Sequence, residues 1–142
     1  MTKLKTRKKK IVINNCFGGF SLSDEAFELY LNKKKIKWYK ENGFMGSSIY
    51  YKVPPDKYKT LSDKWFNEDG NYKRINNKNW YLSNYDIPRD DAVLIEVIKE
   101  LGKKANSRYS ELKIVEIPSD VDWEISEYDG LEKVEEKHRS WN

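Results

Sequence analysis

A stretch without any sustained apolar period, residues 36–85, separates two regular ends of this 142-residue chain. The stretch contains twelve of the twenty aromatic residues, and glycines, prolines and asparagines punctuate it. Such a pattern is typical of loops and short elements, so the regular elements must come from the two ends. We therefore predict one α/β domain over residues 10–142, into which residues 36–85 are inserted as loops, short strands and a short helix near 60–67.

The first end predicts a strand, a glycine turn and a helix. Residues 10–16 contain three consecutive β-branched apolar residues, which favour a buried strand. Gly18 and Gly19 then indicate a turn, because glycine tolerates positive φ and close backbone approach. Ser23 offers an N-cap, which predicts a helix over about residues 22–35.

A second helix is predicted near the middle of the chain. Asp90 or Asp91 offers its N-cap, and an apolar stripe continues to about residue 103. Just before this helix, residues 80–82 are expected to form a strand of the main sheet.

Strand signals occupy the rest of the chain. Residues 112–117, with the sequence Leu-Lys-Ile-Val-Glu-Ile, favour a strand that a proline ends, and residues 121–126 alternate between apolar and polar types. Asp129-Gly130 is typical of a hairpin turn, which leaves residues 131–141 as a closing strand or a short helix. Together these elements predict an α/β fold with a mixed sheet of about four or five strands and two main helices.

Charge and residue content exclude several classes of protein. The net charge of +4 is concentrated at the start, where residues 1–9 form a basic tail. One cysteine and one histidine cannot build a Cys/His-rich zinc site, and a single cysteine suits a reducing compartment. No apolar run has the length of a membrane span or the pattern of a signal peptide, so we expect a cytoplasmic protein without a membrane partner.

Four blocks of the sequence resemble small proteins encoded by tailed phages and prophages. They contain the runs KIVINNCFGGF, DIPRDD, ELKIVEIP and EKHRSW, and together they cover about half of the chain. The resemblance implies a protein located in the cytoplasm of an infected host cell. Because that family has no assigned activity, the resemblance implies no catalytic residue. By analogy of class, small phage proteins of this size include sponges that sequester nucleotide immune signals.

The junction between the first strand and the first helix is one candidate ligand site. Backbone N–H groups at Gly18 and Gly19, together with the Ser21 hydroxyl, suit a phosphate at a helix N-terminus. The alternative is structural: the glycines make the turn while Phe17 and Phe20 pack.

A second candidate site combines cationic and aromatic side chains from the later part of the chain. Arginine forks grip phosphate, and an aromatic ring stacks on a base. The alternative for each cation is an ion pair with a nearby acid. The residues are Arg89, Arg108, His138, Arg139 and Trp141.

The aromatic residues of the insertion alternate with lysines, as in Lys37-Trp38-Tyr39-Lys40. This composition suits stacking on a base, a nucleotide lid or a subunit interface, and the structural alternative is a small separate core. Catalysis has little support, because Cys16 and His138 are the only candidates for a nucleophile and an imidazole base.

These observations lead to a prediction of function. We expect a non-catalytic phage anti-defence protein that sequesters a phosphate-bearing, nucleotide-derived signal, forms a homo-oligomer and needs no cofactor or metal. The first alternative is a phage regulator or inhibitor that binds a host protein, or nucleic acid through the basic tail. The second alternative is a small nucleotide-processing enzyme.

Overall fold

The computed structural model describes residues 7–42, 48–54 and 81–137, and the chain divides into two compact units. The first unit contains residues 1–34 and 84–142, and the second contains residues 35–83. A single domain with residues 36–85 inserted was expected, and the second unit has nearly the bounds of that insertion.

The first unit opens with a buried strand, β1 (Lys8–Asn14), which pairs antiparallel with β5 (Leu112–Pro118). Ile11, Val12 and Ile13 are buried in the core, as expected of consecutive β-branched residues. Both strands were predicted, and β1 begins and ends two residues earlier than expected.

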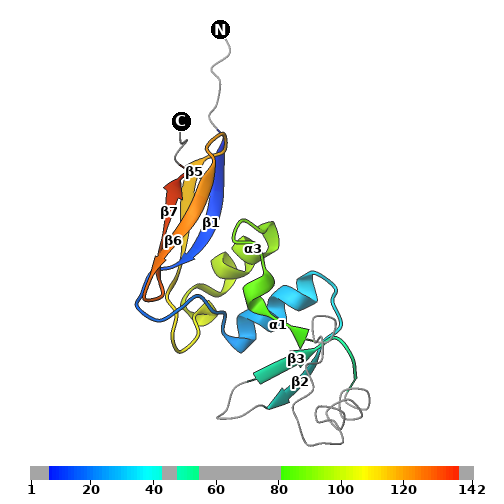
Figure 1. Ribbon diagram of the computed structural model, residues 1–142. Helices are drawn as coiled ribbons and strands as arrows, with labels where there is room; N and C mark the ends of the chain where they lie inside the picture. The colour runs from blue at the N-terminus through cyan, green and yellow to red at the C-terminus, as the bar shows by residue number, and fades with distance from the viewer. Residues whose placement is uncertain (1–6, 43–47, 55–80, 138–142) are drawn as a thin grey trace, which may run out of the picture. The chain divides into compact units, whose positions relative to one another are not determined.

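Two helices begin directly after the N-cap residues that the sequence predicted. The side chain of Ser23 accepts a hydrogen bond from the Ala26 N–H at 3.1 Å, and α1 (Asp24–Lys33) begins there. Asp91 caps α3 (Ala92–Leu101) in the same way. Figure 1 shows α3 between α1 and the strands, and α3 contacts both β1 and α1.

Short 3-10 helices precede and follow α3. The first is η3 (Asn84–Asp86), and the second is η4 (Gly102–Ala105), which begins at a glycine with a φ of 56°. Within the described residues, no helix is long and apolar enough to cross a membrane.

A hairpin completes the first unit. Strands β6 (Trp123–Tyr128) and β7 (Leu131–Glu136) pair antiparallel around Asp129 and Gly130, whose φ values are 48° and 86°. Positive φ at both central residues is the geometry that favours an Asp-Gly turn. The predicted hairpin is confirmed, and the closing segment is a strand as far as Glu136, while residues 138–141 lie outside the described residues.

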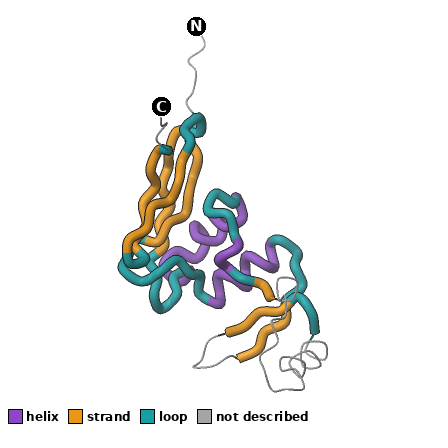
Figure 2. Tube along the Cα trace, in the orientation of Figure 1, coloured by secondary structure: helices purple, strands orange, loops and turns teal. Residues whose placement is uncertain are grey.

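The two pairs of strands lie on the same side of α3 (Figures 1 and 2), and β7 contacts β1. Side chains make this junction: the Asn14 N–H donates to Glu132, and the Lys9 ammonium lies 5.6 Å from the ring centroid of Trp123. The α/β class with two main helices is therefore confirmed. Across the described residues its strands form three small antiparallel sheets in place of one mixed sheet.

The second unit contains an antiparallel sheet in the order β2 (Tyr39–Asn42), β3 (Ser48–Tyr51) and β4 (Tyr81–Leu82). Tyr50 and Tyr51 are buried, and the rings of Tyr51 and Tyr81 lie 5.1 Å apart. The expectation that residues 80–82 belong to the main sheet was wrong, because β4 pairs with β3. The short helix expected near 60–67 lies outside the described residues.

Candidate functional site

A hollow of about 440 Å³ opens on the first unit where three loop segments meet. One wall is the segment 18–21 between β1 and α1, and another is the β6–β7 turn. Tyr109, just before β5, and Tyr85, in η3, complete the rim. The volume falls within the range of about 300–1,000 Å³ that is typical of small-molecule sites.

Glycines allow the three segments to approach one another closely. A Cβ at Gly18 would collide with the carbonyl oxygen of Tyr109, and a Cβ at Gly130 would collide with the backbone of Gly18. The Gly19 N–H donates to that same Tyr109 carbonyl at 3.2 Å. Among the described glycines, positive φ occurs only at Gly102 and Gly130. Gly18 is therefore required because the Tyr109 carbonyl leaves no space for a Cβ, and not because of its backbone conformation.

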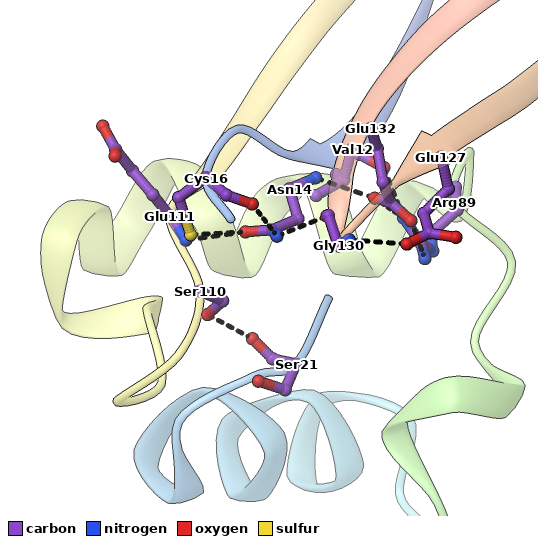
Figure 3. A network of polar contacts seen from close by, with 10 residues as sticks. All are labelled: Val12, Asn14, Cys16, Ser21, Arg89, Ser110, Glu111, Glu127, Gly130 and Glu132. Carbon is purple, nitrogen blue, oxygen red and sulfur yellow. Dashed lines mark hydrogen bonds and ion pairs between the residues drawn. The ribbon is translucent and has the colours of Figure 1, made fainter. Parts of the chain in front are cut away.

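Asn14, at the end of β1, connects these segments through every polar atom of its side chain (Figure 3). Its Nδ2 donates to the carbonyl oxygens of Gly130 and Cys16 at 2.8 and 3.0 Å. Its Oδ1 accepts from the N–H of Glu111 at 2.8 Å. Because Asn14 is fully buried, these bonds fix the position of the β6–β7 turn beside β1.

Arg89 covers the free edge of β1. Its carbonyl accepts from the Val12 N–H at 2.8 Å, and its Nη1 donates to the Val12 carbonyl at 3.3 Å. The guanidinium also makes a bidentate ion pair with Glu132, at 2.6 and 2.9 Å, and lies 3.5 Å from the ring centroid of Phe20. The ion pair with a nearby acid, which was the structural alternative for this arginine, is therefore present.

Ser21 belongs to a cluster of serines beside the hollow. Its hydroxyl and that of Ser107 share a short hydrogen bond, and the Ser110 hydroxyl donates to the Ser21 carbonyl at 2.7 Å. These bonds connect the segment before α1 to the segment before β5. The Ser21 hydroxyl thus has a partner inside the protein.

Two acidic residues give the hollow its charge. Glu132 is almost buried and accepts from both Arg89 and the Asn14 N–H, the latter at 2.8 Å. The exposed Glu127 accepts from the Gly130 N–H at 2.5 Å through one oxygen. With Arg89 as the only cation in the described lining, the formal charge of the hollow is negative.

Three aromatic rings contribute the apolar surface. Phe20 is buried and lies under Arg89, whereas Tyr85 and Tyr109 are 71% and 68% exposed. Exposed rings at the rim of a pocket are suited to stacking on a planar ligand.

Four of the eight predicted site residues line this hollow: Gly18, Gly19, Ser21 and Arg89. Arg108 is exposed beside Tyr109 and is not part of the lining. His138, Arg139 and Trp141 lie outside the described residues.

Three lining residues, Tyr109, Glu127 and Glu132, were not among the predicted site residues, and Tyr85 was expected in the insertion. Glu127 and Glu132 had a usable signal, because each acid lies two residues from the Asp-Gly turn and the two are partners across the hairpin.

A separate polar cluster joins α1 to α3. The Tyr30 hydroxyl donates to Asp91 at 2.9 Å, and the Lys34 ammonium lies 3.1 Å from the same carboxylate. Burial raises the pKa of Tyr30 well above its ordinary value, and the Asp91 carboxylate raises it further. Burial alone would raise the pKa of Asp91, but hydrogen bonds from Tyr30, Lys34 and two backbone N–H groups lower it.

Other candidate chemistry is sparse in the described part of the chain. The Cys16 thiol lies 3.4 Å from both the Asn14 side-chain oxygen and the Tyr109 carbonyl. Of the basic run, Lys8 and Lys9 lie in β1 and pair with Glu116 and Asp90 at 3.8 and 3.0 Å. Residues 7–42, 48–54 and 81–137 contain no group of three or more side chains placed to hold a metal ion.

Comparison with models of protein families finds no match, and comparisons with curated proteins and with solved structures find none either.

Proposed function

We propose that this protein is a non-catalytic binding protein that sequesters a small nucleotide-derived ligand in the hollow beside Gly18. The observation that carries the proposal is convergence: Gly19, Arg89 and Tyr109 come from distant parts of the chain and line one space. A volume of about 440 Å³ and two exposed tyrosines support a planar, drug-sized ligand.

Sequestration requires affinity and no reaction. In the phage setting that the resemblance implies, a protein in excess of the signal lowers its free concentration simply by binding it. A dissociation constant of 1 nM corresponds to about −12 kcal/mol. Stacking of one base on aromatic side chains contributes about 1–3 kcal/mol, so hydrogen bonds to the ligand must supply much of the rest.

Calorimetry with cyclic ADP-ribose isomers, cyclic dinucleotides and cyclic trinucleotides tests the proposal. We expect at least one to bind, and chromatography should recover it unchanged. Tyr85→Ala and Tyr109→Ala should each weaken binding by about 1–3 kcal/mol. Tyr128→Ala is the matched control, because that tyrosine is 72% exposed but does not line the hollow. No binding tighter than about 10 μM (about −7 kcal/mol) to any of them would refute the proposal.

Binding of a host protein is the second candidate, and exposed rings favour it. Phe17, Tyr85, Tyr109 and Tyr128 are each about 70% exposed, and aromatic residues are enriched at protein interfaces. Incubation of the tagged protein with host extract should then recover a partner that a Phe17→Ser/Tyr128→Ser variant does not bind. Retention of the partner by this variant would argue against the interface.

A further inference from the structure

We infer that the base of the ligand, and not its phosphate, enters the hollow, and that Glu127 selects a base with an exocyclic amino group. This inference rests on the proposed function and specifies the chemistry of the same site.

The charges of the lining argue against phosphate inside the hollow. Glu127 and Glu132 contribute two negative charges, and Arg89 contributes one positive charge. The Arg89 guanidinium already makes a bidentate pair with Glu132 at 2.6 and 2.9 Å. A phosphate there would meet two carboxylates and an arginine that is already neutralised, so its place is toward solvent.

The two carboxylates differ in what they can still accept. Glu132 is 8% exposed, and both of its carboxylate oxygens already accept hydrogen bonds from Arg89 or from the Asn14 N–H, so it has little capacity left to bind a ligand. Glu127 is exposed, and one of its oxygens accepts from the Gly130 N–H. Its second oxygen has no hydrogen-bond partner among the described residues (Figure 3).

An ionised carboxylate only accepts hydrogen bonds, so a ligand that meets Glu127 must present a donor. Adenine, guanine and cytosine carry an exocyclic amino group, whereas thymine presents a carbonyl oxygen in the corresponding place. The rings of Tyr85 and Tyr109 stack on any base and do not discriminate among them. We therefore expect Glu127, and not the two tyrosine rings, to determine which bases the hollow binds.

Matched nucleotide pairs test the inference on the unmodified protein. We expect AMP to bind about tenfold or more tightly than purine riboside 5′-monophosphate, and CMP about tenfold or more tightly than UMP, the range for a charge-assisted hydrogen bond. Adenosine should bind within about tenfold of AMP, because the phosphate lies outside the hollow.

Glu127→Gln should reduce the ratio within each pair by several-fold, because the amide oxygen still accepts a hydrogen bond but no longer carries the charge that strengthens it. Glu124→Gln is the matched control, since Glu124 is an exposed acid of β6 outside the lining, and it should keep both ratios. Equal binding within each pair, with affinity that rises with each phosphate, would overturn the inference and leave the proposed function standing. Failure of every linear and cyclic nucleotide to bind would overturn both.

Discussion

The guanidinium of Arg89 lies between a strand edge that needs a partner and a hollow that a ligand would enter. It hydrogen-bonds the Val12 carbonyl, pairs with Glu132 and stacks on Phe20. An unpaired strand edge invites pairing with other chains, so covering this one protects the fold. The Arg89 side chain therefore both stabilises the fold and lines the candidate site.

Arg89→Ala should lower the free energy of unfolding by about 3 kcal/mol, because it leaves the almost buried Glu132 carboxylate without its charge partner. Arg108→Ala, at an exposed arginine near the same loop, should change it by less than about 0.5 kcal/mol. Urea unfolding measures both. Equal, small losses would mean that the Arg89–Glu132 pair contributes little to stability.

Neighbouring glycines give a second prediction at this scale. Gly18→Ala should cost about 1–3 kcal/mol, because the added Cβ collides with the Tyr109 carbonyl. Gly19→Ala should be neutral or slightly stabilising, since a Cβ there meets nothing within 4 Å. Thermal melting of the two variants provides the comparison, and a melting temperature lowered equally in both would contradict it.

At the scale of elements, the contact between α1 and α3 depends on Asp91, which caps α3 and also binds Tyr30 and Lys34. Its pKa is lowered in the folded protein. The stabilisation is therefore present above the pKa of the unfolded chain, about 3.9, and is lost as the pH falls through the lower folded value.

Asp91→Asn keeps a side chain that caps a helix but removes the ionisable group. The difference in unfolding free energy between the wild type and this variant should be constant from pH 6 to 8 and should shrink below about pH 4. Denaturant unfolding across this range measures it, with Asp122→Asn at an exposed carboxylate as the control. A difference independent of pH would show that the Asp91 charge does not act on stability.

Local signals made the elements of the first unit predictable. The caps at Ser23 and Asp91 and the turn at Asp129-Gly130 each depend on a few neighbouring residues. Strand partners do not follow from such signals, which is why β4 was assigned to the wrong sheet. For the same reason the sequence could indicate that Arg89 pairs with an acid, but not that the acid is Glu132, which lies 43 positions further along the chain.

At the scale of the whole molecule, the clearest sign of a further interface is the set of four exposed rings among the described residues of the first unit. Phe17 and Tyr128 do not line the hollow, so a ligand there would leave them in solvent. Large exposed apolar groups are commonly covered by another subunit. A homo-oligomer, as the sequence suggested, stays a prediction.

Size-exclusion chromatography with light scattering should give a mass above that of one 17.0 kDa chain. The Phe17→Ser/Tyr128→Ser variant should move the mass toward the monomer, because it removes two rings without touching the lining of the hollow. A monomeric wild-type protein at high concentration would rule out the oligomer.

The hydrogen bonds of Asn14 also bear on how the hollow comes into being. They join β1 to Gly130 in the β6–β7 turn and to Glu132 in β7, across 116 and 118 positions of sequence. Such long-range contacts slow folding, because the entropy of closing a long loop is lost before the contact can stabilise the fold. A nascent chain that stops before Gly130 therefore lacks one wall of the hollow and cannot contain it.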